Sequence, residues 1–170
     1  MPSSFEYSLT ATLAPMEGWC SGPKAILLAR YIRDEQLARC LEIGVFGGKS
    51  LLAIGLAQAN AEIASPITVG VDPWRVQDCI EGEPDPVNVQ WWSNVEMLHV
   101  VHRKCMEAIW NAGLVDRIFI LRNSSAAAAS LLAGIEWDLI HIDGNHSEVS
   151  STRDVALWLP RLRPGGIMGF

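Results

Sequence analysis

Apolar and polar positions divide the chain into two kinds of segment that alternate. Short, mostly apolar runs lie at 40–45, 67–71, 117–121, 138–142 and 167–170. Longer stretches with helix-like patterns lie at 25–32, 50–61, 89–112, 125–133 and 147–159. Strands buried on both faces form nearly continuous apolar runs, and strands that alternate with helices form right-handed βαβ units. The pattern therefore predicts an α/β fold with a doubly wound, mostly parallel sheet.

Two segments interrupt this alternation. The chain opens with a polar stretch, residues 1–17, and we separate an N-terminal segment, residues 1–22, from a core domain at 23–170. Residues 77–88 contain four acidic residues and two prolines, which predicts a loop without regular structure. A loop of that length is either a lid or binding loop, or a solvated excursion without a role, and both interpretations stay open.

Composition and charge narrow the classes of protein. The 170 residues suffice for one domain, and 49% hydrophobic against 19% charged residues argues against a disordered chain. A net charge of −6 repels a phosphate backbone, so nucleic acid is a poor partner. No signal peptide is visible, and apolar runs are shorter than the roughly 18 residues of a membrane span. The cysteines form no Cys-x-x-Cys pair, so we expect a soluble, cytoplasmic protein with ordinary thiols that binds no membrane.

A glycine-rich segment joins the first predicted strand to the helix that follows. It runs from Glu42 to Ser50, which we count among the binding residues. Gly44 permits a tight turn, and Gly47 and Gly48 let a ligand approach the backbone at the helix start. The carboxylate of Glu42 is suited to the amino group of an amino-acid-like ligand.

An acid ends the second predicted strand. Asp72 is followed by Pro73 and Trp74. A carboxylate at that place can accept both hydroxyls of a ribose, and Trp74 is close enough to pack against a bound nucleoside. The glycine loop and the strand-end acid are more specific together than either alone, and they predict an adenosine-containing cofactor.

Three kinds of cofactor compete for the glycine loop. A phosphate-binding loop needs four residues between its glycines, whereas Gly44 and Gly48 enclose three. The dinucleotide fingerprint needs a glycine where this chain has Phe46, which leaves a nicotinamide-dependent dehydrogenase as a weaker alternative. The remaining pattern, acid-x-Gly-x-x-x-Gly, favours S-adenosylmethionine.

A second group of polar residues follows the fourth predicted strand. Asp143 lies at its carboxyl end, on the same rim as the glycine loop, where ligands bind in open α/β sheets. His146 lies near the next helix start and is a candidate base or metal ligand. Asn145 and Glu148 also have the spacing of a helix cap and its return carboxylate, so the segment is either functional or simply the start of a helix.

Small polar residues and tryptophans complete the set of candidates. Ser124 and Ser125 follow the third predicted strand, where they either hydrogen-bond an adenine edge or cap the alanine-rich helix. Trp91, Trp92 and Trp110 lie near the acidic loop, and we expect them in the core or at an interface.

These residues resemble a bacterial family of class I S-adenosylmethionine-dependent methyltransferases, related to sugar and small-molecule O-methyltransferases. The resemblance covers nearly the whole chain from Gly18 onward. Its motifs are the segment from Glu42 to Ser50, Asp72-Pro73-Trp74, Trp91-Trp92, Ile142 to His146, and Leu159 to Gly166. The last motif resembles the turn before the fifth strand of such enzymes, and its Pro164-Gly165-Gly166 is a sound helix terminator.

The resemblance implies a Rossmann-like methyltransferase core that methylates an oxygen of a small-molecule acceptor. It places Glu42 at the methionine end of the cofactor, Asp72 at the ribose and the region of Ser124 at the adenine. In related enzymes the position that matches Asp143 often helps to bind a divalent metal, usually magnesium, which lowers the pKa of an acceptor hydroxyl. His146 is the base that the resemblance implies.

The chain ends at Phe170, where the fifth predicted strand ends. Relatives continue with an acidic pair that often completes the metal site, and with two further strands. We therefore expect a sheet that lacks the last two strands, in a short variant or a truncated product. Because Asp143 alone offers too few metal ligands, a truncated cofactor-binding module without catalytic activity is an alternative to the enzyme. An exposed edge strand also predicts a covering partner chain, as in a homodimer.

Overall fold

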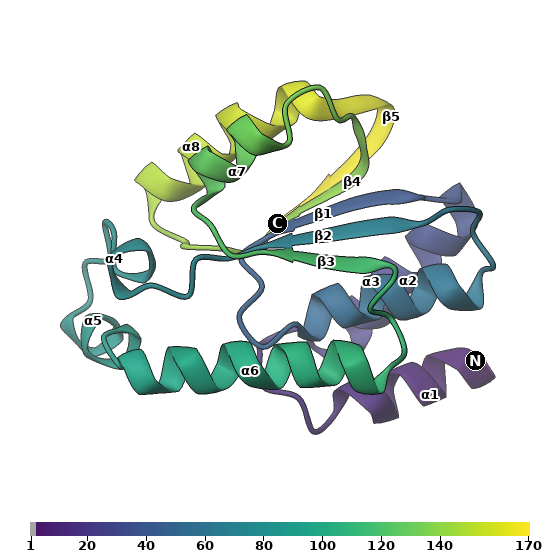
Figure 1. The fold of residues 1–170 in the computed structure, drawn as a ribbon, viewed down its shortest axis with the longest axis horizontal. Helices are drawn as coiled ribbons and strands as arrows, with labels where there is room; N and C mark the ends of the chain where they lie inside the picture. Colours follow the sequence, from purple (N-terminus) through teal and green to yellow (C-terminus); the bar gives the residue numbers. More distant parts are fainter. Residues whose placement is uncertain (1–2) are drawn as a thin grey trace.

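The computed structural model describes residues 3–170 as a five-stranded sheet with helices on both faces (Figure 1). Its strands are β1 (Arg39–Ile43), β2 (Ile67–Val71), β3 (Ile118–Leu121), β4 (Trp137–Ile142) and β5 (Leu162–Gly169). All neighbours are parallel, and the strand order is β3-β2-β1-β4-β5. The order reverses between β1 and β4, which is where doubly wound sheets bind ligands. The α/β fold predicted from the sequence is confirmed.

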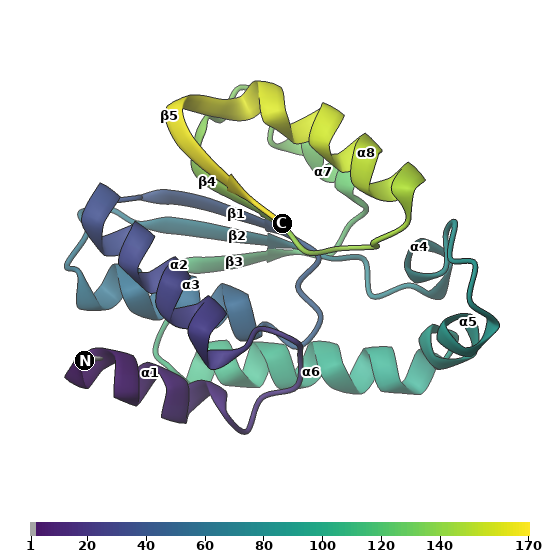
Figure 2. The same ribbon diagram turned by 180° about the vertical axis from the view of Figure 1, so that it is seen from behind.

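The helices form a layer on each face of the sheet (Figures 1 and 2). One layer contains α1 (Ser4–Leu13), α2 (Gly22–Glu35), α3 (Lys49–Asn60) and α6 (Val95–Asn111). The other contains α7 (Ser125–Leu131) and α8 (Glu148–Trp158), and a short 3-10 turn, η1 (Leu159–Arg161), leads into β5. Alternate strand residues serve the two layers, since Cys40 packs in the larger core and Leu41 in the smaller one. Within residues 3–170, no helix combines the length and apolar character that crossing a membrane requires.

The acidic segment after β2 is more regular than predicted. It contains two short helices, α4 (Val76–Cys79) and α5 (Pro86–Trp92), so the prediction of an irregular loop at 77–88 is wrong at both ends and holds only for 80–85. The Asp85 side chain accepts the Val87 N–H at 2.8 Å, and Pro86 occupies the first turn of α5. Proline has no N–H to satisfy and a φ that suits a helix start, so the Asp-Pro pair begins a helix instead of preventing one.

The single helix predicted at 89–112 is interrupted. α6 begins only at Val95, after Asn94 has capped it by accepting the Met97 N–H at 2.9 Å. Asparagine is a strong N-cap because its side-chain oxygen satisfies an N–H of the first turn. The local cap therefore overrides the helical spacing that continues through this position.

β5 begins earlier than the predicted run at 167–170. It starts at Leu162 and includes Pro164 to Gly166, so the prediction that these residues end a helix is wrong. The pairing of β5 with β4 shifts register between Trp137 and Leu139. An edge strand accommodates a proline and extra residues because one of its sides has no neighbour to bond.

The polar opening of the chain contains a helix, α1, that packs against α2 and α3. Ser3 and Glu6 form a complete capping box, in which each side chain accepts the other's backbone N–H. Leu9 and Leu13 are buried in the larger core. Glu6 also binds α2, with its Oε1 2.7 Å from Nε of Arg30. Residues 3–13 therefore share the core of the rest of the chain.

The ion pair between Glu6 and Arg30 predicts a specific pH dependence of stability. The Arg30 side chain, with help from the Ser3 N–H, lowers the pKa of Glu6 from 4.5 to about 2. A lowered carboxyl pKa stabilises the folded protein above the unfolded-state value, and this contribution is lost as the pH falls through the folded-state value. Glu6→Gln should therefore lower the melting temperature at neutral pH and flatten its decrease in acid, as measured by circular dichroism. The exposed Glu35→Gln is the control, and an unchanged acid slope in Glu6→Gln would contradict this role.

Candidate functional site

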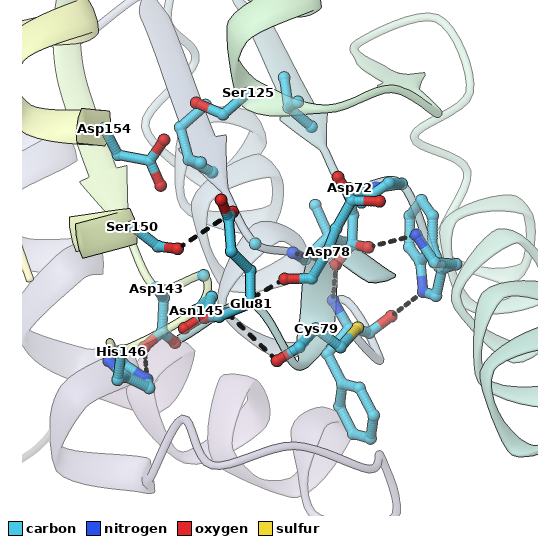
Figure 3. A pocket seen from close by; sticks show the side chains of 18 of the residues that line it. Asp72, Asp78, Cys79, Glu81, Ser125, Asp143, Asn145, His146, Ser150 and Asp154 are labelled. Carbon is cyan, nitrogen blue, oxygen red and sulfur yellow. Dashed lines mark hydrogen bonds and ion pairs between the residues drawn. The ribbon is translucent and has the colours of Figure 1, made fainter. Parts of the chain in front are cut away.

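The carboxyl edge of the sheet holds a cavity of about 1130 Å³ (Figure 3). Its wall includes residues that follow β1, β2 and β4, the first residues of α7, the segment that contains α4, and residues of α8. Residues predicted from separate parts of the sequence therefore meet in one place, because parallel strands present their carboxyl ends at one edge.

Gly44 lines this cavity at the end of β1 and has a φ of +85°. A Cβ atom added there would lie 2.3 Å from Cα of Gly144 and 2.4 Å from the carbonyl oxygen of Asp143. The ends of β1 and β4 therefore approach so closely that only glycine fits between them.

Gly47 and Gly48 serve contacts within the protein. A Cβ atom on Gly47 would lie 2.3 Å from the carbonyl oxygen of Glu17, and one on Gly48 would lie 2.5 Å from Sγ of Cys105. Gly48 also has a φ of +79° at the start of α3. These glycines let other protein segments, rather than the cavity itself, approach the loop.

The carboxylate of Asp72 joins the loop after β1 to the end of β2. Its Oδ2 accepts the N–H groups of Val45 and Phe46, each at 2.9 Å, and its Oδ1 accepts the Trp74 N–H at 2.7 Å. Burial raises the pKa of Asp72, and the three N–H donors act in the opposite direction. Since Oδ1 has one of these donors, the carboxylate retains capacity for a further donor from a ligand.

Trp74 lines the cavity but is only 2% exposed. Its Nε1 donates to the carbonyl of Phe46 at 3.1 Å, and its ring lies against His102 with centroids 4.4 Å apart. Most of its surface is therefore used inside the protein, and little is left for a nucleoside.

Glu42 is fully buried on β1, opposite His141 of β4. Its Oε1 lies 2.7 Å from Nδ1 of His141, while Oε2 has no hydrogen-bond partner among residues 3–170. Burial raises the pKa of Glu42, and His141 and the Ser50 hydroxyl oppose the shift. Burial acts most strongly and lowers the pKa of His141, but the hydrogen bond to Glu42 and the negative charges of Glu42 and Asp143 together outweigh it, so the pKa is raised. Ser50 lines the cavity, so Glu42 lies just behind its wall.

Asp143 and His146 both line the cavity beyond β4. Nε2 of His146 lies 3.8 Å from Oδ1 of Asp143, and the two side chains are 80% and 24% exposed. The Asp143 N–H donates to the carbonyl of Ile43 at 2.8 Å, which anchors this loop on β1. The structure therefore places an accessible imidazole near a carboxylate whose backbone is anchored to β1.

The helix after Asp143 is capped differently from the prediction. Ser147 is the N-cap of α8 and accepts the Ser150 N–H at 3.3 Å, so the capping box assigned to Asn145 and Glu148 is wrong. The Asn145 amide instead donates to three carbonyls at 3.0, 3.2 and 2.8 Å, those of Asp78, Cys79 and Glu81. Asn145 thus ties the end of α4 and the turn after it to the start of α8.

Ser124 and Ser125 lie at the start of α7 and line the cavity. Ser124 is the N-cap, and its Oγ accepts the Ala127 N–H at 3.4 Å. Oγ of Ser125 accepts the indole N–H of Trp158 at 2.8 Å. Capping by Ser124 is therefore confirmed, and the position of both residues on the cavity wall leaves contact with a ligand as a prediction.

Four aromatic rings cluster beside the cavity. Trp19 and Phe46 have centroids 5.0 Å apart, and those of Trp91 and Trp92 are 4.6 Å apart. Trp91 is 45% exposed and Trp110, on α6, is 72% exposed, so neither belongs to the core.

A family model described as a methyltransferase domain matches residues 41–170. The chain belongs to this family. None of the curated proteins matches it. The match begins within β1 and includes β2 to β5, and therefore every carboxyl strand end that contributes to the cavity.

Solved structures share the fold of this methyltransferase domain. The SAH-bound Podospora anserina methyltransferase PaMTH1 has a TM-score of 0.68 at 18% identity, over 98% of this chain and 61% of that one. An O-methyltransferase from Bacillus cereus in complex with SAH has a TM-score of 0.64 at 15% identity, over 99% of this chain and 66% of that one. A third structure is the SAM-bound O-methyltransferase TomG from Streptomyces achromogenes, which is involved in tomaymycin synthesis. Its TM-score is 0.63 at 16% identity, over 99% of this chain and 65% of that one. The chain spans less than two thirds of the length of each.

The residues of the methyltransferase domain do not fit the magnesium site that the resemblance implies. Within residues 3–170, no three His, Cys, Asp or Glu side chains gather closely enough to hold a metal ion. Magnesium requires near-octahedral oxygen coordination, and Asp143 has the imidazole of His146 as its titratable neighbour.

The sequence patterns missed several residues of the cavity wall. Arg153 of α8 binds the carboxylate of Glu81 with both terminal nitrogens, at 2.9 and 2.6 Å. Ser150 and Asp154 are buried polar residues on the same helix. The two residues are four positions apart, so they lie on the same face of the helix. Polar residues on the buried face of a helix are uncommon, and this spacing was the signal by which the sequence could have marked them as candidates.

The contact at Gly44 predicts a difference between two glycines. Gly44→Ala and Gly134→Ala both place a side chain at positive φ, +85° and +84°, which costs about 1 kcal/mol in either case. At Gly134 an added Cβ meets no atom of residues 3–170 within 4 Å. Chemical denaturation should therefore show a clearly larger loss of stability for Gly44→Ala. Equal losses would refute the close approach of β1 and β4.

Proposed function

We propose that this methyltransferase domain binds S-adenosylmethionine in the cavity and transfers its methyl group to an oxygen of a small-molecule acceptor. The observation that carries the proposal is the meeting of Gly44, Asp72, Ser125 and Asp143 at one cavity. These residues follow β1, β2, β3 and β4, so four strand ends contribute to one ligand site. Membership of the methyltransferase family and the cofactor-bound relatives of the same fold support it.

Residues on the cavity wall, and Glu42 just behind it, suit the successive parts of the cofactor. The unpartnered Oε2 of Glu42, behind Ser50, suits the ammonium of the methionine part. Asp72 retains acceptor capacity for a ribose hydroxyl, and Ser124 and Ser125 lie where the base would follow. The volume of about 1130 Å³ exceeds the roughly 300–1,000 Å³ of common ligand sites, which leaves room for an acceptor beside the cofactor.

The proposed chemistry is an in-line displacement. The bound cofactor supplies a methyl group on a positively charged sulfur. The protein holds the acceptor oxygen in line with the methyl carbon, which is the main source of acceleration that a binding site offers. His146 takes the proton of the acceptor hydroxyl as S-adenosylhomocysteine leaves, and Asp143, with its Oδ1 3.8 Å from Nε2 of His146, helps to orient the imidazole.

The part of the cavity that we assign to the acceptor is lined mainly by aromatic and other apolar residues. Trp19, Phe46 and Trp92 line the cavity together with Gly18 and Leu98. We place the acceptor against these rings, since aromatic faces bind both planar molecules and the apolar faces of sugars. We also propose that the protein is cytoplasmic and that it forms a homodimer in which the partner covers the edge strand β5.

Cofactor binding is the first test. Isothermal titration calorimetry should give a one-to-one complex with S-adenosylhomocysteine and no heat with NAD. Binding of NAD alone would favour a dehydrogenase and contradict the proposal. In the same experiment, Asp72→Asn should weaken S-adenosylhomocysteine by about 1–3 kcal/mol, because an amide cannot accept all of the same N–H and hydroxyl donors.

A matched control separates the role of Asp72 from a general effect of charge. Asp34→Asn removes an exposed carboxylate at the end of α2 and should leave the affinity unchanged. If Asp72→Asn folds and binds S-adenosylhomocysteine as tightly as Asp34→Asn does, then Asp72 has no role in binding the cofactor.

Methyl transfer is the second test. Release of S-adenosylhomocysteine is measured with a panel of sugars and phenols as acceptors. His146→Ala should reduce the rate by about 10²–10⁴-fold while cofactor affinity stays the same, as expected for loss of a general base. The exposed His99→Ala on α6 is the control. Cofactor binding without turnover on any acceptor would favour the binding module without catalytic activity.

A further inference from the structure

A buried carboxyl group on α8 has no role in the function proposed above. Asp154 lines the cavity and is only 4% exposed. Its Oδ1 has no hydrogen-bond partner among residues 3–170. Figure 3 shows the carboxyl group pointing into the space between Ser125 of α7 and Ser150 of α8. A buried polar atom without a partner is costly, so its presence on a cavity wall points to a ligand that completes it.

The charges around Asp154 do not compensate it. The adjacent Arg153 directs its guanidinium to the carboxylate of Glu81, at 2.9 and 2.6 Å. Burial raises the pKa of Asp154, with the Ser125 hydroxyl and Arg153 acting in the opposite direction and Glu81 adding to the rise. In its ionised form the carboxyl group accepts hydrogen bonds and donates none. The missing partner is therefore an N–H or O–H donor.

The position of Asp154 relative to the other cavity residues identifies that donor. Asp72 ends β2, and Ser125 follows β3, the strand beside β2. Asp154 faces Ser125 from α8, the helix packed beside α7 in the same layer, and Trp158, one turn further along α8, binds Ser125 directly at 2.8 Å. A nucleoside whose ribose lies at Asp72 therefore extends its base toward the pair of Ser125 and Asp154.

We propose that Asp154 accepts a hydrogen bond from the exocyclic amino group of adenine and thereby selects an adenine cofactor. The inference rests on the cofactor site proposed above and adds a specificity-determining residue from α8 to it. Purines without an amino group at that position leave the buried carboxyl group unpaired. A site built to bond a ligand N–H rejects the analogue that lacks it, because the buried acceptor then loses its partner.

The test compares ligands that differ at single positions of the base. Wild-type protein is titrated with S-adenosylhomocysteine, with its 6-desamino analogue, and with its 7-deaza analogue as the ligand control. We expect the 6-desamino compound to bind about 5-fold to 100-fold more weakly, in line with one unsatisfied buried acceptor. The 7-deaza compound keeps the amino group and should bind nearly as well as S-adenosylhomocysteine.

Variants then assign the preference to one residue. Asp154→Leu should bind S-adenosylhomocysteine and the 6-desamino analogue equally, and bind the latter about as well as wild type does. Asp154→Asn keeps an acceptor oxygen and should keep the preference, and Thr152→Leu, exposed on the same helix, is the matched control. Asp154→Ala takes the place of the leucine variant if circular dichroism shows that the latter is unfolded.

The outcomes separate the inference from the function on which it rests. Equal affinity of wild type for the two nucleosides overturns the inference, as does a leucine or alanine variant that weakens both ligands by the same factor. In both cases the cofactor site itself stands. If folded wild type binds none of the three compounds, the proposed function fails and the inference fails with it.

Discussion

The carboxylate of Asp72 connects the fold to the candidate site. It accepts two N–H groups of the loop after β1 and one from the residues after β2. Leaving such buried donors without an acceptor costs about 1–3 kcal/mol each, so this one side chain determines the path of the loop. Because β1 lies between β2 and β4, the same loop sets where Gly44 meets Gly144 and hence where Asp143 lies. The cavity therefore depends on an interaction that joins the ends of β1 and β2 and, through Gly44, positions the end of β4.

Buried acids give this cavity its chemical character. Burial raises the pKa of Glu42, Asp72 and Asp154, and each acid is only partly compensated by the protein. Glu42 has His141, Asp72 has backbone N–H groups and Asp154 has a serine hydroxyl. A ligand that carries positive charge and several N–H and O–H donors supplies what these acids lack. An amino-acid-linked adenosine with a charged sulfur has those properties, which agrees with the proposed cofactor.

The sequence predicted the sheet and much of the cavity because both follow from short-range patterns. Apolar runs marked every strand, and the residues at the strand ends, such as Asp72 and Asp143, were found by position alone. Long-range contacts decided the rest. The partners of Asn145 lie in the α4 segment, and the role of Gly47 depends on Glu17, neither of which spacing reveals. Asp85, Pro86 and Asn94 did carry local capping signals, which acidic composition and continuous helical spacing obscured.

Hydrogen–deuterium exchange with and without S-adenosylhomocysteine tests the central claim, that the carboxyl edge of the sheet binds this nucleoside. The account predicts slower exchange at 44–50, 72–81, 123–127 and 143–150, where the loops of the cavity lie. The helix α1, on the far side of the larger core, should exchange at the same rate in both samples and serves as the internal reference. Unchanged exchange in all four segments, at ligand concentrations that saturate binding, would contradict the account.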